Sequence, residues 1–381
     1  MATYNIEDLR TTDFLEPDHP RLRAAARTIQ RLRPDVLLIN EIAYDQEGVL
    51  GYEPGDGPGF NPERFVRRYL SEPQDSGLTA IAYRVLSVTP NTGIPSGFDL
   101  DNSGEAVTDF PRPEVSGPQG SPPRQTESQR AYGNDAWGFG TFPGQYSMAL
   151  FVTERVRILR DQVRSFRELR WSDMPGAMQP MDPATGEPWY SPAEWAEMRL
   201  SSKNHVDVPV RLANGFVIHL LLSHPTPPAF DGPEQRNKKR NHDEIRFWID
   251  YIEGASYIVD DEGVSGGLPA GASFAIMGDL NADPDEGSSL ENPIGKLLEH
   301  SRVNDNFVPV ASEGRREALP ELDPDDTAVW GLRVDYVLPS IDIEVLSGGV
   351  WRPVSDAERA SDHFPVYVDI LVPAPERAVS R

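Results

Sequence analysis

The sequence predicts an α+β fold in which short buried strands are interspersed with amphipathic helices. Apolar runs such as residues 36–39 and 274–277 are too short for helices and are followed closely by polar residues, Gly or Pro. Residues 20–33 and 234–251 instead repeat apolar side chains at the three- and four-residue spacing of a helix with one buried face. The chain of 381 residues is long enough to bury a sizeable core, as one large domain or two ordinary ones.

Strands follow one another along the chain with helices between them, as in α+β proteins. We expect strands at residues 3–6, 35–39, 79–83, 144–152, 206–210, 215–223, 274–278, 332–339 and 364–370. We expect helices at residues 20–33, 62–70, 192–200, 234–251 and 293–300. Pro20 suits the first turn of the first helix, and Pro34 ends it because proline has no amide hydrogen to donate.

One long segment interrupts this pattern. Residues 90–123 contain seven prolines among many Gly, Ser and Asp residues, which predicts an ordered loop rather than a packed element. We therefore expect a single domain over residues 1–372 with a loop insertion around residues 86–143, and a frayed tail at residues 373–381.

The insertion contains a pattern typical of calcium loops. Alternating oxygen-bearing side chains surround Gly104, namely Asp99, Asp101, Ser103 and Glu105. The twelfth position, where such loops carry a bidentate Glu, is Phe110. The segment is either a structural cation loop or a turn rich in Asp and Asn.

The composition excludes several kinds of site and partner. The absence of cysteine excludes disulfides, thiolate metal sites and cysteine nucleophiles. A net charge of −24 disfavours extended nucleic-acid binding but leaves a small or locally gripped phosphoester open. No apolar run is long enough to span a bilayer, and we expect a monomer. A strand tail directly follows Met1, so if a preceding segment was removed we expect a secreted rather than a cytoplasmic protein.

Polar residues of catalytic types lie at the ends of the predicted strands. They are Asn5, Glu41, His224, Asp279, Asn281, Asp362 and His363. Each alone is compatible with an ordinary turn or a solvated strand end, but their shared position favours one site where strand ends meet. Asp335 lies among apolar neighbours, and a buried carboxylate needs a partner.

These groups suit the hydrolysis of a phosphate ester, which needs a divalent cation, an activated water and donors to the phosphoryl oxygens. Oxygen ligands such as Glu41 and Asp362 select Mg²⁺ or Mn²⁺, with Ca²⁺ as an alternative. Two histidines suit a base and an acid near neutral pH. The basic cluster from Arg236 to Arg240 is either a solvated helix face or a rim that faces phosphate.

Six segments resemble, in order, the motifs of the endonuclease/exonuclease/phosphatase superfamily, which has a deoxyribonuclease-I-like fold. They are residues 3–6, 34–41, 223–224, 278–281, 333–336 and 361–363. The resemblance covers nearly the whole chain. It implies a four-layer α/β/β/α sandwich of two packed, mostly antiparallel sheets, with the site where the strand ends meet.

The resemblance also implies roles by position. It assigns metal binding to Asn5, Glu41 and Asp362, catalysis to His224, Asp279, Asn281, Asp335 and His363, and substrate contact to Tyr146, Arg236 and Arg240. Asp279 would align or deprotonate the attacking water, Asn281 would contact the phosphate, and Asp335 would orient His363. His224 matches a histidine of the deoxyribonuclease-I-like and sphingomyelinase-like branches where abasic-site repair enzymes carry tyrosine, which argues against a repair nuclease.

The sequence departs from the family pattern at Asn40, where a Gln is usual, and at Ser147, where a Gly is usual. In some branches an acidic residue holds the second histidine. No such acidic residue is evident in this sequence, and Gln145 is the candidate to take its place. We expect a metal-dependent phosphodiesterase that directs water in line at phosphorus. The alternatives are an extracellular nuclease, which the basic cluster favours and the net charge disfavours, and a catalytically silent binding module on the same fold.

Overall fold

The computed structural model describes residues 1–53, 55–111 and 121–372. The expected tail at residues 373–381 and residues 112–120 of the expected insertion lie outside the described residues. The strands are β1 (Ala2–Leu9), β2 (Val36–Ile42), β3 (Arg84–Val88), β4 (Met148–Val152), β5 (Val156–Ile158), β6 (Arg164–Ser165), β7 (His205–Leu212), β8 (Val217–Ser223), β9 (Phe274–Asp279), β10 (Asp335–Pro339), β11 (Glu344–Val350) and β12 (Val366–Leu371).

The helices lie between these strands and are mostly short. They are α1 (Thr11–Leu15), α2 (Pro20–Leu32), α3 (Asn61–Phe65), α4 (Glu127–Asn134), α5 (Pro192–Glu197), α6 (Arg236–Ile252), α7 (Pro293–Leu298) and α8 (Glu313–Arg316), with a π-helical turn η1 (Val66–Leu70) and the 3₁₀ turns η3 (Arg160–Gln162), η4 (Trp171–Asp173) and η5 (Asp356–Glu358). Across the described ranges, no helix combines the length and apolarity needed to cross a bilayer.

The strands form two sheets of six. The first has the order β11-β12-β1-β2-β4-β3, and the second has the order β10-β9-β8-β7-β5 with β6 paired to β7. The neighbours β1 and β2, and β8 and β9, run parallel, whereas the other pairs run antiparallel. The expected pair of mostly antiparallel sheets is therefore confirmed.

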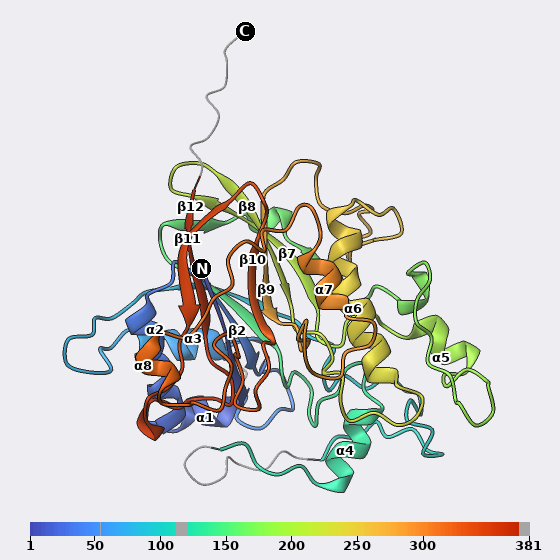
Figure 1. Cartoon of the computed structure of the whole chain (residues 1–381). Helices are drawn as coiled ribbons and strands as arrows, with labels where there is room; N and C mark the ends of the chain where they lie inside the picture. The colour runs from blue at the N-terminus through green and yellow to red at the C-terminus, as the bar shows by residue number, and fades with distance from the viewer. Residues whose placement is uncertain (54, 112–120, 373–381) are drawn as a thin grey trace.

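The sheets and helices stack in four layers, as Figure 1 shows with α2 and α3 on one outer side and α6 and α7 on the other. Side chains alternate between the two faces of a strand, so each sheet buries both faces. In β2, Leu38 packs between the two sheets, whereas Leu37 and Ile39 face the cluster that contains α2. Truncating a core side chain such as Leu38 to Ala would cost roughly 2–5 kcal/mol of folding free energy.

Two helices cover the outer faces through apolar stripes. In α2, Leu22 and Ile29 pack onto the first sheet, and the helix ends at Leu32, because the next residue, Arg33, has a left-handed backbone with φ 48°. In α6, Trp248 packs onto the second sheet, and its indole Nε1 donates a hydrogen bond of 2.8 Å to Ser223 Oγ at the end of β8. This contact fixes α6 against the strand that leads to His224.

The structure corrects several predicted boundaries: β4 begins at Met148 rather than at residue 144, β10 begins at Asp335 rather than at residue 332, and α7 ends at Leu298 rather than at residue 300. The strand expected at residues 79–83 is β3, because pairing with β4 starts only at Arg84, which lies opposite Val152. Ile81 and Tyr83 are buried as expected of strand residues, but the Ile81 amide donates to the Leu70 carbonyl instead of a strand. The helix expected at residues 192–200 ends at Glu197, since Met198 adopts an extended backbone.

The described part of the insertion is anchored to the sandwich. The Asn91 amide donates to the Lys203 carbonyl over 2.8 Å, and Thr92 Oγ1 donates to the Gln145 carbonyl. Leu100 is buried in the core under α6. The insertion therefore reaches the segments that border the strand ends.

The predicted cation loop forms a turn of hydrogen-bonded carboxylates. Asp99 accepts hydrogen bonds from the amides of Ser103 and Gly104 over 2.9 and 2.7 Å. Carboxylate oxygens of Asp99, Asp101 and Asp135 lie within 4.8 Å of one another, and this group does not include the predicted Glu105. Hydrogen bonds from the backbone account for the turn, and cation binding there stays a prediction.

Candidate active site

Ends of strands from both sheets meet around one cavity of about 890 Å³. Most residues predicted for the site line this cavity, namely Glu41, Tyr146, His224, Arg236, Arg240, Asp279, Asn281, Asp362 and His363. Asn5 and Asp335 are buried and contact the lining side chains Glu41, Asp279 and His363 from behind. The structure therefore brings all eleven predicted catalytic, metal and substrate residues to one region, within the cavity wall or directly behind it.

Asp279, the last residue of β9, lies at the centre of the polar groups. Its Oδ2 is 2.9 Å from Asn5 Nδ2, 3.4 Å from His224 Nε2 and 3.6 Å from His363 Nε2. Its Oδ1 accepts the Asn281 amide over 2.9 Å. Gly278, the residue before Asp279, lets the backbone of β9 lie close to the end of β8, because a Cβ at this position would lie 1.9 Å from the Ser223 carbonyl oxygen.

Asn5 joins the predicted metal ligand to this central carboxylate. Its Nδ2 donates to Glu41 Oε1 over 3.0 Å and to Asp279 Oδ2 over 2.9 Å. The Asp8 amide donates to Glu41 Oε2 over 2.8 Å, so both oxygens of Glu41 are oriented. The register of β1 and β2 shifts between Asn5 and Leu9, where Glu7, Asp8 and Glu41 have left-handed backbones.

His363 is paired with the buried carboxylate of Asp335. The two are 2.8 Å apart, with His363 Nδ1 donating to Asp335 Oδ2. Burial opposes a charged imidazole, but the carboxylates of Asp335 and Asp279 raise the pKa of His363 well above its ordinary value. His363 is therefore an imidazolium whose Nε2 faces Asp279, and the ring of Trp330 packs against it edge to face at 5.0 Å.

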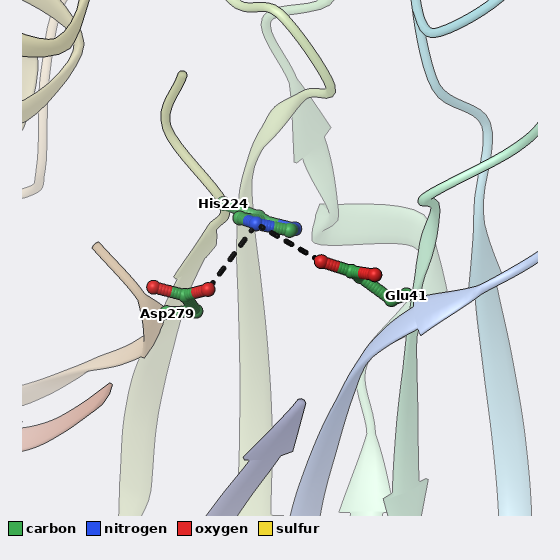
Figure 2. Close-up of side chains that lie close together, drawn as sticks. All are labelled: Glu41, His224 and Asp279. Atoms are coloured by element: carbon green, nitrogen blue, oxygen red, sulfur yellow. Dashed lines mark ion pairs between the residues drawn. The ribbon is translucent and has the colours of Figure 1, made fainter. Parts of the chain in front are cut away.

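His224 lies in the same site in the opposite protonation state. Figure 2 shows it between Asp279 and Glu41, with Nε2 3.4 Å from Asp279 Oδ2 and 4.0 Å from Glu41 Oε1. Burial, reinforced by the Lys203 ammonium, lowers the pKa of His224 to about 4. The two histidines of the site therefore carry different charges at neutral pH.

The acidic wall of the cavity fits a hard divalent cation. Burial and the nearby Asp362 carboxylate raise the pKa of Glu41 to about 7, and the same two causes raise the pKa of Glu7 to about 7. A cation between such crowded carboxylates would relieve this repulsion. Ligand atoms of Glu41, His224 and Asp279 lie within 4.8 Å of one another, and Asp362 lines the same cavity. Oxygen-rich donor sets of this kind suit Mg²⁺, Mn²⁺ and Ca²⁺.

Tyr146 and Gln145 lie just before β4, on the side of the site that carries Asp8. The Tyr146 hydroxyl accepts a hydrogen bond of 3.1 Å from Gln125 of the insertion, and the residue has φ 58°. Gln145 does not hold His224 as expected, because its Nε2 donates to Asp8 over 2.9 Å and its Oε1 accepts from Thr141. Gln145 instead orients an acidic residue next to Glu41.

The basic cluster at the start of α6 is not a solvated face at Arg236 and Arg240. Arg240 is 7% exposed, and its guanidinium donates to the carbonyls of Trp137, Arg199 and Leu200. Arg236 donates to the Leu100 carbonyl over 3.0 Å. Both residues line the cavity while fastening the surrounding loops to α6, and their contact with substrate stays a prediction.

Sequence reasoning missed five charged residues that line the cavity: Glu7, Asp8, Arg130, Lys203 and Asp283. Glu7 and Asp8 follow Asn5 inside β1, and only the polar interruption of that strand could have indicated them. Lys203 precedes β7, and the pairing of His205 with Ser223 places it beside the chain that follows His224. This neighbour relationship follows from the register of β7 against β8, which the two strands expected at residues 206–210 and 215–223 did not specify.

The sequence matches one family of known proteins over nearly its whole length. A model described as the endonuclease/exonuclease/phosphatase family matches residues 2–363. The comparison with curated proteins finds no match.

The solved structures that this chain matches are distant in sequence. An endonuclease/exonuclease/phosphatase of Beutenbergia cavernae is 17% identical over 99% of this chain and 72% of that chain, with a TM-score of 0.48. An endonuclease/exonuclease/phosphatase family protein of Leptotrichia buccalis is 13% identical over 97% and 98%, also with a TM-score of 0.48. A mannosyl-6-phosphatase of Bacteroides thetaiotaomicron is 13% identical over 97% and 98%, with a TM-score of 0.42. Since the family model spans nearly all of the sequence, this chain belongs to the endonuclease/exonuclease/phosphatase family.

Proposed function

We propose that this chain is a divalent-metal-dependent phosphodiesterase that directs a water molecule in line at phosphorus. Members of its family are hydrolases that act on phosphoesters. The observation that carries the proposal is the arrangement around Asp279, where one carboxylate oxygen lies within 3.6 Å of Asn5, His224 and His363. An ionised acceptor beside one neutral and one protonated imidazole suits general acid–base chemistry.

Each group has a role that follows from its protonation state. Although burial alone would raise the pKa of Asp279, the positive charge of His363 and a hydrogen bond from His224 hold it below its ordinary value. Asp279 therefore stays ionised and accepts a hydrogen bond from the attacking water, which aligns the water with phosphorus. The His363 imidazolium donates to the phosphoryl or leaving-group oxygen.

Glu41 and Asp362 would hold the divalent cation, and Asn5 would support them through its hydrogen bond to Glu41, since its own amide oxygen accepts the Glu7 backbone amide. When bound, the cation neutralises the negative charge that develops on the phosphoryl oxygens. Asn5 keeps Glu41 and Asp279 at a fixed separation through its two hydrogen bonds. The same amide therefore couples the geometry of the metal ligand to that of the water acceptor.

The cavity supports a diester over a long nucleic acid. It extends past the polar centre to Phe139 of the insertion and to Trp330, which leaves room for two ester groups on phosphorus. The net charge of −24 repels long polyanions. A nuclease is the second candidate because Arg236 and Arg240 line the cavity. However, the Arg240 guanidinium already donates hydrogen bonds to three backbone carbonyls.

A substrate panel tests the proposal. The protein is stripped with EDTA and assayed on bis-nitrophenyl phosphate, nitrophenyl phosphate, plasmid DNA and a phospholipid, with Mg²⁺, Mn²⁺ or Ca²⁺ restored. We expect a small diester, bis-nitrophenyl phosphate or the phospholipid, to be turned over fastest, only with metal, and the Asp279→Asn variant to be inactive. Faster cleavage of DNA would favour the nuclease, and a folded protein that turns over none of the panel would indicate the silent binding module.

A further inference from the structure

Lys203 is a buried lysine in the wall of the catalytic cavity. The sequence contains only four lysines among its 36 basic residues, at positions 203, 238, 239 and 296. Lys203 is 6% exposed, whereas the Lys296 side chain is half exposed and pairs with Glu291 over 3.4 Å. Most basic residues of this chain are arginines, but the one that lies beside His224 and Asn281 in the cavity wall is a lysine.

The backbone around Lys203 is fixed from two directions. The Asn91 amide of the insertion donates to the Lys203 carbonyl over 2.8 Å. The buried carboxylate of Glu244, on α6, accepts the Ser202 amide and the Thr226 amide, both over 2.6 Å. Glu244 therefore ties the segment that carries Lys203 to the segment that follows His224, and the lysine is held in a defined position.

The ammonium of Lys203 points to the same place as the amide of Asn281. Lys203 Nζ donates to the Pro225 carbonyl oxygen over 3.2 Å, and Asn281 Nδ2 donates to that same oxygen over 3.2 Å. Two donors thus converge on one neutral acceptor, next to His224 in the chain. An ammonium has three N–H donors. Within the described residues, Lys203 Nζ donates one of them to the Pro225 carbonyl, which leaves donors for a ligand.

A positive charge at Lys203 would favour the binding of an anionic phosphoryl group in this acidic cavity. Burial lowers the pKa of Lys203, and the carboxylates of Glu244, Glu41 and Asp279 oppose this shift because they favour the ammonium. An anionic phosphoryl group that enters this acidic cavity is repelled by those carboxylates unless positive charge lies nearby. Lysine supplies a compact point charge, whereas arginine supplies a planar fork of the kind that Arg240 uses for backbone carbonyls.

We propose that Lys203 is a catalytic residue whose ammonium, beside the Asn281 amide, binds a non-bridging oxygen of the phosphoryl group as negative charge develops on it. The inference rests on the proposed phosphodiesterase function. Glu244 also favours the charged form of Lys203, but its carboxylate is held by two backbone amides, and the Lys203 ammonium donates its hydrogen bond to the Pro225 carbonyl instead.

The first test compares Lys203→Met, Lys203→Arg and the exposed control Lys296→Met. We expect Lys203→Met to lower kcat/KM roughly 100-fold on the best substrate of the panel, mostly through kcat, because a donor to the developing charge is lost. Inorganic phosphate, titrated as an inhibitor with Mg²⁺, should bind to this variant about tenfold more weakly, because a charged donor to its oxygens is lost. A tenfold change corresponds to roughly 1.4 kcal/mol. Lys203→Arg should recover part of the loss, and Lys296→Met should match the wild type. A folded Lys203→Met with unchanged kinetics and phosphate inhibition overturns the inference.

The second test uses the wild-type protein and does not depend on the folding of a Lys203 variant. With ¹⁵N-labelled lysine, the four side-chain signals are assigned by Lys238→Arg, Lys239→Arg and Lys296→Arg, which leaves Lys203 by elimination. Adding inorganic phosphate with Mg²⁺ should shift the Lys203 Nζ signal selectively, and an unmoved signal at saturating phosphate overturns the inference. Wild-type protein that is inactive on the whole panel refutes the phosphodiesterase itself, so the two failures are distinguishable.

Discussion

His363 Nδ1 donates to Asp335 Oδ2 over 2.8 Å, and both side chains are almost fully inaccessible to solvent. Asp335 is the first residue of β10, whereas His363 precedes β12 of the other sheet. The pair therefore bridges the two sheets at the end where the cavity opens. It also explains why an apolar strand can begin with a carboxylate, since the imidazolium compensates its charge.

Replacing Asp335 should slow the reaction without weakening substrate binding. Asp335→Asn keeps the shape of the side chain but removes the charge that holds His363 protonated. We expect kcat to fall roughly 100-fold with little change in KM, because the imidazolium acts mainly in the transition state. Steady-state kinetics on the preferred substrate measure this, with the exposed Asp305→Asn as the matched control.

The double variant tests whether the pair acts as one unit. Asp335→Asn combined with His363→Ala should be little slower than His363→Ala alone, because the carboxylate has nothing left to orient. Losses that multiply in the double variant would show that Asp335 serves another purpose, most simply the packing of β10.

Removing the charge of Glu41 should weaken metal binding. Glu41→Gln leaves the side chain the same shape but replaces a carboxylate by a neutral amide at the end of β2. We expect the affinity for Mg²⁺ or Mn²⁺ to fall at least about tenfold, in the range typical when the surroundings of a metal are altered. Isothermal titration of the EDTA-stripped protein measures this, with the exposed Glu53→Gln as control. Equal affinities for both variants would remove Glu41 from the ligand set.

The pH dependence of folding should report on His205. This residue is buried beside Phe247 and Trp248, and burial lowers its pKa to about 4 from an ordinary value of 6.5. Because the folded pKa is depressed, the unfolded chain binds the proton first as pH falls. The free energy of unfolding should therefore decrease from pH 6.5 down to about 4, by about 3 kcal/mol from this group.

Urea unfolding between those pH values, in the wild type and in His205→Gln, isolates the contribution. The variant should lose part of the slope, since the remaining acid sensitivity comes from other groups such as His224. Identical slopes would mean that His205 is accessible to water or already protonated in the folded protein.

Much of the fold and the site could be predicted from strand ends. Buried strands appear in sequence as continuous apolar runs, so the polar residue after each run marks the edge of a sheet. This rule identifies four residues of the site from the sequence, namely Asn5, Glu41, His224 and Asp279. Asp335 needed a partner on energetic grounds, and the structure supplies His363.

The remainder depended on pairing that no local pattern specifies. Strand β11 has an exposed face and two glycines in its sequence, so it carries no clear apolar run. Residues 79–83 have the composition of a strand but lie outside the ladder that begins at Arg84. Lys203 enters the site only through the register of β7 against β8, which brings it next to Pro225.

The most direct test of the account follows the oxygen atom of the attacking water. Bis-nitrophenyl phosphate is hydrolysed in H₂¹⁸O by the metal-restored protein, and both products are analysed by mass spectrometry. If water aligned by Asp279 attacks phosphorus, the label appears in nitrophenyl phosphate and none appears in nitrophenol, and Asp279→Asn lowers the rate of this labelling at least about 100-fold. Label in nitrophenol, or undiminished labelling by Asp279→Asn, would contradict the mechanism.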